Sequence, residues 1–199
     1  MSNSEIQVPL ENYKGGLITG EELFKISDDC YRYELNKGRL RKMAPAGIKH
    51  GVIASRLDAR LQLFVEQHNL GIVCAAETGF YLEKEPDTVK AADVSFYAWE
   101  SIPNDIPEGY GDLPPDLAVE VMSPNDSLIE TEKKALAYLE KGSKMVWVIY
   151  PKKQTVTIYR KGSQKTLKST DVLDGEDVIP GFSVNVAEIF PSLPNQKNA

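Results

Sequence analysis

Two nearly continuous apolar segments limit the possible folds of this chain more than any other feature. They are DLAVEVM, residues 116–122, and KMVWVIYP, residues 144–151. Strands of this kind are typical of central sheet positions that are covered on both faces. The segment between them, residues 128–141, has helical periodicity. Its predicted inward side consists of Leu128, Glu132, Ala135, Leu136 and Leu139.

The remaining periodicity predicts an α/β sandwich with a mixed sheet. A helix is expected over residues 51–68, followed by strands at 71–82 and 90–98. With the two apolar strands and the second helix, the core order is helix, three strands, helix, strand, or αβββαβ. Hairpins are expected at both ends of this core, over 31–43 and 144–162. We expect one domain over residues 16–192, with loose segments at 1–15 and 193–199.

Composition favours a cytoplasmic protein without a membrane span. The longest apolar run, residues 145–150, is too short to cross a bilayer, and no secretory signal is visible at the N-terminus. Cys30 and Cys74 match no metal or redox spacing, so we expect reduced structural thiols.

Charge is distributed unevenly along the chain, whose formal net charge is −6. Residues 37–60 contain seven basic side chains and one acidic, a net of +6, and residues 152–168 contain six basic and no acidic. The rest of the chain therefore carries −18. The two basic segments are either two solvated faces or the walls of a groove for a polyanion.

Glu120 lies in the middle of an apolar strand and needs a partner, because burying an unpaired carboxylate is costly. It either forms an ion pair, stays wet at a cleft or binds a metal. Asp93, at the start of an expected neighbouring strand, favours the metal. Two carboxylates on adjacent strands can share a hard cation such as Mg²⁺. The only histidines, His50 and His68, and the absence of a Cys pair argue against zinc.

Five segments in this order resemble the Uma-two family of restriction endonucleases, within the PD-(D/E)XK (restriction-endonuclease-like) nuclease superfamily. They span almost the whole chain, and each is weak by itself. They are YELNKGRLRKMAP with the later His50, AADVSFY, PPDLAVEVMSPNDS, EKKALAYLEKGSKMVWVIYP and VIPGFSVNVAEIF. The resemblance implies a restriction-endonuclease-like αβββαβ fold and metal-dependent cleavage of DNA, with Mg²⁺ or Mn²⁺ as the cofactor. It also suggests a homodimer.

The resemblance assigns roles to four acidic or basic residues. Asp93 matches the aspartate of the PD half-motif, and Glu120 matches the acidic residue of (D/E)XK, with the Val121 carbonyl as a further metal ligand. Glu34 matches an upstream glutamate that the family places near the same centre. In EKKALAY, Lys134 matches a helix lysine that precedes a tyrosine by one turn.

Two positions depart from the PD-(D/E)XK pattern. Ala92 replaces the proline before Asp93, and Met122 replaces the lysine two residues after Glu120. A lysine on a long stem can reach a phosphate from the following helix, so we expect Lys134 to substitute for the missing lysine. The alternative is that Lys134 is an ordinary solvated lysine, as we expect Lys133 to be.

Four further residues are weaker candidates. Asp116 is either a second carboxylate behind Glu120 or the partner of a base at the strand mouth. Glu77 is either a further acid near the centre or an edge charge. Lys49 and His50, at the start of the first long helix, are candidates for contact with a phosphate of nucleic acid, and the alternative for His50 is an ordinary surface residue.

Three functions are consistent with these residues. The first is a metal-dependent endodeoxyribonuclease in which Glu34, Asp93, Glu120 and Lys134 do the chemistry. The second is a catalytically inactive nucleic-acid-binding or regulatory module of the same fold, which the substitutions at Ala92 and Met122 favour. The third, a two-carboxylate glycosidase, explains Asp93 and Glu120 but neither the helix lysine nor the basic segments.

Overall fold

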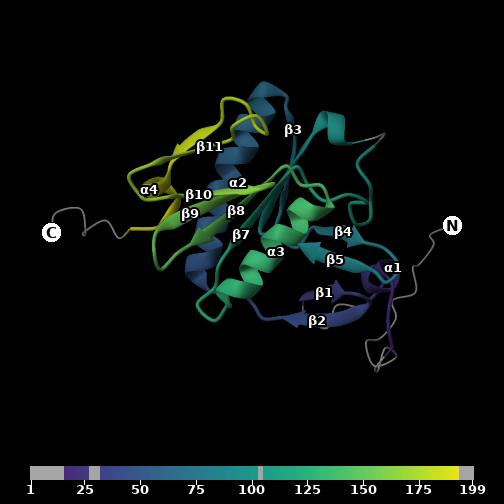
Figure 1. Ribbon diagram of the computed structural model, residues 1–199. Coiled ribbons are helices and arrows are strands. Elements are labelled where there is room, and N and C mark those ends of the chain that lie inside the picture. The colour runs from purple at the N-terminus through teal and green to yellow at the C-terminus, as the bar shows by residue number, and fades with distance from the viewer. Residues whose placement is uncertain (1–15, 27–31, 103–104, 193–199) are drawn as a thin grey trace.

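A six-stranded mixed sheet forms the centre of the computed structural model, which describes residues 16–26, 32–102 and 105–192. The strand order is β10-β9-β8-β7-β6-β3 (Figure 1). β7 and β8 are parallel, and every other neighbouring pair is antiparallel. The strands are β3 (Gly71–Ala75), β6 (Val94–Ala98), β7 (Leu117–Val121), β8 (Met145–Tyr150), β9 (Thr155–Arg160) and β10 (Ser163–Leu167).

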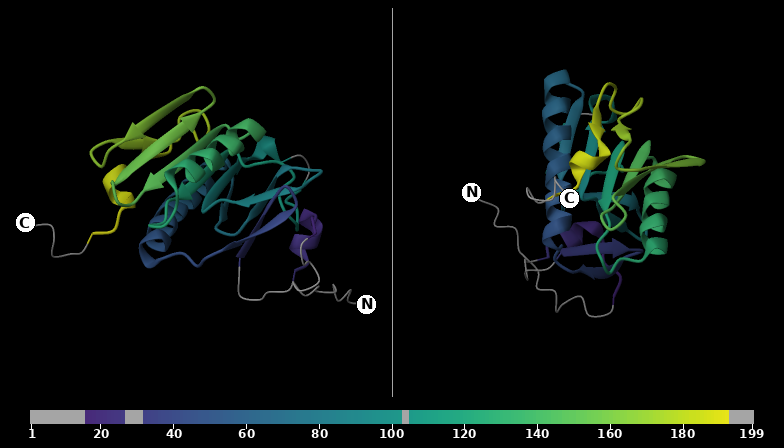
Figure 2. Two further views of the ribbon diagram at one scale, coloured as in Figure 1. Left: turned by 60° about the horizontal axis from the view of Figure 1, so that its bottom comes forward. Right: turned by 90° about the vertical axis from the view of Figure 1, so that its left-hand side faces the viewer.

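Two long helices cover opposite faces of this sheet (Figure 2). α2 (Ile48–His68) packs an apolar stripe onto one face, and α3 (Leu128–Lys141) packs onto the other. Along β7, Leu117, Val119 and Val121 belong to the α2 core, because side chains alternate along a strand. Ala118 belongs to the α3 core, and Glu120 shares its side of the strand.

The predicted core order is confirmed. α2, β3, β6, β7, α3 and β8 follow one another as helix, three strands, helix and strand. Smaller elements surround them. These are α1 (Gly20–Phe24), β1 (Arg32–Asn36), β2 (Arg39–Met43), β4 (Gly79–Glu83), β5 (Thr88–Ala91), the 3-10 helix η2 (Trp99–Ser101), β11 (Val172–Asp174), β12 (Ser183–Asn185) and α4 (Val186–Ile189).

The single strands predicted at 71–82 and 90–98 are each two strands in different sheets. β3 and β6 pair in the central sheet, whereas β4 and β5 form a separate hairpin that is inserted between them in the sequence. The β1–β2 hairpin packs beside β5. Alternation of apolar and polar residues cannot distinguish a continuing strand from one that changes sheets. The second of these breaks, at 92–93, positions the candidate site.

The predicted inward side of residues 128–141 is partly wrong. Leu128 and Leu136 are 51% and 50% exposed, and α3 instead buries Ala135, Tyr138 and Leu139. The helix is rotated relative to the prediction because Tyr138 and the stem of Lys134 both turn inward. A pattern that counts lysine as solvent-facing cannot anticipate this rotation.

The predicted loose segments, 1–15 and 193–199, and Cys30 lie outside the described residues. No helix in the described part of the chain is long and apolar enough to span a membrane. Cys74 is half-buried and free, and burial raises the pKa of its thiol.

Candidate functional site

The candidate site lies in an open cleft of about 990 Å³. Glu34 reaches it from β1, Glu120 from β7 and Lys134 from α3, and Asp93 reaches it from the break between β5 and β6. All four residues line the cleft. The structure therefore brings together the four residues that the sequence singled out, although they come from four separate parts of the chain.

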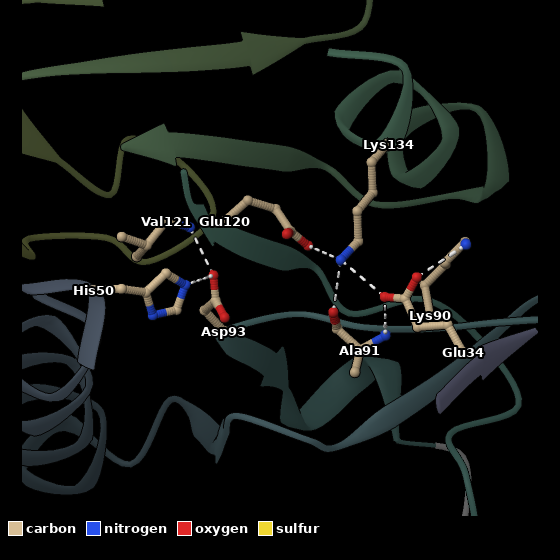
Figure 3. Close-up of polar contacts among 8 residues, drawn as sticks. All are labelled: Glu34, His50, Lys90, Ala91, Asp93, Glu120, Val121 and Lys134. Carbon is tan, nitrogen blue, oxygen red and sulfur yellow. Dashed lines mark hydrogen bonds and ion pairs between the residues drawn. The ribbon is translucent and has the colours of Figure 1, made fainter. Parts of the chain in front are cut away.

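The ammonium of Lys134 lies at the centre of the site (Figure 3). Lys134 Nζ is 2.9 Å from Glu120 Oε1 and 3.0 Å from Glu34 Oε1, and it donates a 2.9 Å hydrogen bond to the Ala91 carbonyl. The Glu120 contact is an ion pair by distance without hydrogen-bond geometry, so Glu120 Oε1 has no hydrogen-bond partner among the described residues. Lys134 is thus directed at Glu120, whereas the side chain of Lys133 is 70% exposed.

A second lysine extends this cluster. Lys90 Nζ on β5 donates a 3.0 Å hydrogen bond to Glu34 Oε2, and the backbone N–H of Ala91 donates a 3.4 Å bond to Glu34 Oε1. The side chains of Lys90 and Glu34 are 12% and 5% exposed. Basic and acidic side chains therefore alternate in the order Lys90, Glu34, Lys134, Glu120, and each carboxyl group faces at least one ammonium.

Asp93 is fixed on the other side of Glu120. Its Oδ2 accepts a 2.7 Å hydrogen bond from the backbone N–H of Val121, and its own N–H donates to the Val119 carbonyl. These two bonds attach the break between β5 and β6 to the end of β7. His50 Nε2, from the first turn of α2, lies 3.1 Å from the same Asp93 oxygen.

Burial and charge set the protonation of the carboxyl groups in opposite ways. The pKa of Glu120 is raised to about 8, mainly by burial; Lys134 partly offsets the effect of burial, and the Asp93 charge adds to it. Burial would also raise the pKa of Glu34, but Lys134 and Lys90 together hold it below its usual value. Glu34 is therefore an anion at neutral pH, and Glu120 retains a proton until the pH rises or a cation replaces it.

Lys134 remains charged despite its burial. Loss of solvent lowers the pKa of its ammonium, but the attraction of Glu120, Tyr138 and Glu34 raises it well above its usual value. Tyr138, one turn further along α3, is fully buried, and its hydroxyl has no hydrogen-bond partner among the described residues. The tyrosine that follows Lys134 by one turn in EKKALAY therefore packs against the same cluster.

The donor set suits a hard cation held by few protein ligands. The described residues contain no group of three or more His, Cys, Asp or Glu side chains in an arrangement that holds a metal. Asp93 and Glu120 supply carboxylate oxygens from the two sides of the β6–β7 junction, and Glu120 Oε1 lacks a hydrogen bond. Mg²⁺ is commonly bound by one or two carboxylates, with water and substrate oxygens as its other ligands.

Of the two weaker acidic candidates, Glu77 lies in the cleft and Asp116 does not. Asp116 lies at the opposite end of β7, where it pairs with Lys144 at 2.8 Å and accepts hydrogen bonds from Ser101 Oγ and the Ala98 N–H. Asp116 therefore stabilises the start of β7 and lies at the end of the strand away from Glu120. Glu77 lines the cleft as an exposed carboxylate 3.5 Å from Arg32.

The two predicted nucleic-acid contacts have different surroundings. Lys49 is exposed in the first turn of α2, where a phosphate can reach it. His50 lines the cleft against Asp93, and its imidazole is 12% exposed. Any contact of His50 with nucleic acid would therefore take place inside the cleft.

Two members of the cluster were missed in the sequence. Lys90 and the Ala91 carbonyl precede Asp93 in KAADV, within the segment 90–98 that the alternation predicts as one ordinary strand. The one available indication is Asp93 itself. This acidic residue follows Lys90, Ala91 and Ala92 and indicates that the strand ends close by. Nothing in the sequence shows that this strand end faces Glu34, because their pairing is tertiary.

The two basic segments do not form one groove. The first includes β2 and the first half of α2, and the second includes β9 and β10; β2 and β10 belong to different sheets. Of the first segment, β2 lies well apart from β9 and β10 (Figure 1). Some of these bases are used structurally: Arg56 donates to the Phe190 carbonyl, and Arg160 pairs with Glu176 and Asp177.

Comparison with known proteins shows to which family this chain belongs. A family model described as "Putative restriction endonuclease", Uma2, matches residues 21–187. A crystal structure of a putative nuclease belonging to DUF820 from Anabaena variabilis ATCC 29413 has the same fold, with a TM-score of 0.74 and 22% sequence identity. That match covers 87% of this chain and 97% of the other. No curated protein matches. The chain belongs to the Uma2 family of putative restriction endonucleases.

Proposed function

We propose that this protein is a metal-dependent endonuclease that hydrolyses phosphodiester bonds of DNA. The observation that carries the proposal is the convergence of Glu120 and Lys134, 2.9 Å apart, in a cleft that also contains Asp93. A hard-cation site beside a fixed ammonium is suited to stabilising the charge of a phosphoryl transition state. The family and the shared fold support a nuclease.

Asp93 and Glu120 would hold the divalent cation, Mg²⁺ or Mn²⁺, with the Val121 carbonyl as a further ligand. A cation bound there would supply a Lewis acid and an activated water. Asp93 is already oriented by the Val121 N–H, so this carboxylate needs little rearrangement. Glu120 would release its proton and lose its contact with Lys134.

Lys134 would then remain anchored without Glu120. Glu34 Oε1 and the Ala91 carbonyl hold its ammonium at 3.0 and 2.9 Å. Fixed there, the ammonium can orient the attacking water or offset the charge on the phosphate, the role left open by Met122. Glu34 thus acts as a positioning residue, and Lys90 keeps its carboxylate charged.

Cleavage of labelled DNA tests this proposal. Wild-type protein with Mg²⁺ or Mn²⁺ should cut single-stranded, duplex or branched oligonucleotides, and a chelator should abolish cutting. Asp93→Asn should lower the rate at least ~100-fold, because it weakens the metal site. Glu77→Gln is the matched control, since it removes another carboxylate of the same cleft. Cutting that survives Asp93→Asn would place the activity elsewhere or in a contaminant.

One observation favours an inactive binding module as the second candidate. Lys134 Nζ already lies 2.9 Å from Glu120 Oε1, so the buried carboxyl group has an ammonium beside it without any metal. Thermal unfolding with and without Mn²⁺ separates the candidates. A metal site predicts that Mn²⁺ stabilises the wild type but not Glu120→Ala. An equal response of both proteins would favour the inactive module.

A further inference from the structure

The β1–β2 hairpin has one face that opens into the cleft and continues beyond it. Cross-strand partners point to the same side of a two-stranded sheet. Glu34 is paired with Arg41, and the flanking pairs on that side are Arg32 with Met43 and Asn36 with Arg39. Arg32, Glu34 and Met43 line the cleft. Arg41 and Arg39 therefore follow from the cleft toward the hairpin turn.

The opposite face of the hairpin is committed to packing. Leu35 is fully buried, with Ile18, Leu23 and Val89, and Tyr33 and Leu40 pack against the same cluster. The arginine face has no such cover, because Arg39 and Arg41 are both exposed. Within the described residues, neither guanidinium forms a hydrogen bond or an ion pair. Two fixed cations therefore remain unpaired beside the site.

The cleft itself is lined mainly by acidic side chains, so bases at its rim are needed to bind a polyanion. Five acidic side chains line the cleft against only two basic ones, and Glu120 is the acidic side chain that holds a proton at neutral pH. The acidic side chains are Glu34, Glu77, Asp93, Glu120 and Asp126, and the basic ones are Arg32 and Lys134. A polyanion therefore gains little from the cleft walls and needs cations at the rim. Residues 37–49 supply five bases and no acid. This stretch runs from the hairpin turn through 44–47, which line the cleft, to Lys49.

We infer that Arg39 and Arg41 bind the phosphate backbone of DNA and lead the strand into the cleft. This inference rests on the proposed function and names the surface that holds the substrate. The two residues lie two apart on β2, about 6.7 Å along the strand. Arginine forks can contact phosphates in pairs of hydrogen bonds, so this row suits successive phosphates of one strand. Lys49, at the exposed start of α2, continues the path beyond the cleft mouth.

Binding measured without metal tests the surface separately from the chemistry. Fluorescence anisotropy with labelled single-stranded and duplex oligonucleotides in EDTA reports binding while cleavage is prevented. Arg39→Glu/Arg41→Glu should bind DNA at least ~10-fold more weakly at low salt. For duplex DNA, the slope of log affinity against log salt should become shallower by about two. The milder Arg39→Gln/Arg41→Gln should show a smaller loss in the same direction.

The matched control is Lys161→Glu/Lys165→Glu. These lysines are equally exposed, belong to the second basic segment, and give the same change in net charge at the far edge of the sheet. Its affinity should stay within about twofold of wild type. Circular dichroism and thermal unfolding should show that all variants are folded.

Three results would overturn the inference. One is equal loss in both charge-reversal variants, which would indicate net charge and not a surface. Another is unchanged binding in Arg39→Glu/Arg41→Glu. The third is wild-type protein that binds vesicles containing phosphatidylserine but no oligonucleotide, which would assign the arginines to a membrane surface. Unchanged DNA binding in Arg39→Glu/Arg41→Glu, with metal-dependent cleavage retained in the wild type, would show that this inference fails while the proposed function holds. Weakened DNA binding in this variant, with no metal response or cleavage in the wild type, would show that the proposed function fails.

Discussion

At the scale of single residues, Glu120 connects stability and chemistry. The residue is 8% exposed in an apolar strand, and burial raises the pKa of its carboxyl to about 8. Lys134 beside it stays charged. A proton and the neighbouring ammonium therefore both reduce the free-energy cost of burying this carboxyl. In the proposed metal site, a divalent cation would replace the proton.

Mn²⁺ binding should consequently depend on pH. Below pH 8 the cation must displace the Glu120 proton, so affinity should rise up to ~10-fold per pH unit between about pH 6 and 8 and level off above. Isothermal titration calorimetry in buffers of different ionisation enthalpy measures both affinity and proton release. Glu120→Gln should bind weakly and without this slope. A flat wild-type affinity between pH 6 and 8 would contradict the assignment.

Lys90→Met tests the second ammonium of the cluster. It leaves Glu34 with Lys134 alone, so the free energy of unfolding at pH 7 should fall by roughly 2 kcal/mol. The pKa of Glu34 is lowered in the folded protein. Its stabilisation is therefore present above its usual pKa and is lost as the pH falls, so wild type and variant should converge in acid.

Urea unfolding at several pH values measures this difference. Lys84→Met is the control, because the Lys84–Asp112 pair is exposed, with side chains 59% and 77% accessible. Exposed pairs contribute little, so its unfolding free energy should hardly change. A loss of equal size in both variants at every pH would show that Lys90 has no special relation to Glu34.

At the scale of elements, the site depends on where strands change sheets. β5 ends at Ala91 and β6 begins at Val94. The short connection presents the Ala91 carbonyl to Lys134 on one side and the Asp93 carboxylate to Val121 on the other. The start of β6 must therefore keep its position in the sheet. Pairing with β3 on one side and β7 on the other holds it there.

Two glycines give opposite predictions for these elements. A Cβ at Gly71, the first residue of β3, would collide with the Tyr97 carbonyl, so Gly71→Ala should lower the unfolding free energy by about 1–3 kcal/mol. A Cβ at Gly51 meets nothing within 4 Å, and this residue lies inside α2. Gly51→Ala should raise stability by about 0.5–1 kcal/mol. Chemical denaturation of both variants checks the signs, and destabilisation by Gly51→Ala would contradict this packing.

The sequence predicts the elements better than their connections. The apolar strands that became β7 and β8 and the order of the core are confirmed, because burial on both faces leaves a strong local pattern. The breaks near Glu77 and Asp93 are missed, since a change of sheet alters partners and not alternation. Lys90 was missed for the same reason. It is a charged residue in a short strand, and its role depends on Glu34, 56 residues away in sequence.

At the scale of the whole molecule, the site joins two layers. Glu34 and Lys90 come from the β1–β2 and β4–β5 hairpins, whereas Glu120 and Lys134 come from the central sheet and its α3 cover. The ion-pair cluster therefore couples the hairpin layer to the α/β core. The same hairpin layer presents the exposed arginines at the rim, so the proposed DNA contact and the position of Lys134 depend on one structural unit.

The central claim is that Lys134 on α3 replaces the lysine that is absent at Met122. The most direct measurement is the single-turnover rate of metal-dependent DNA cleavage in Lys134→Met and Lys133→Met. Both variants lose one positive charge from the same helix turn. Of the two lysines, only Lys134 contacts Glu120, whereas Lys133 is exposed, so Lys133→Met is the matched control. We expect Lys134→Met to lose at least ~100-fold in rate while still binding Mn²⁺, and Lys133→Met to cut like the wild type. A folded Lys134→Met that cuts at the wild-type rate would contradict the account.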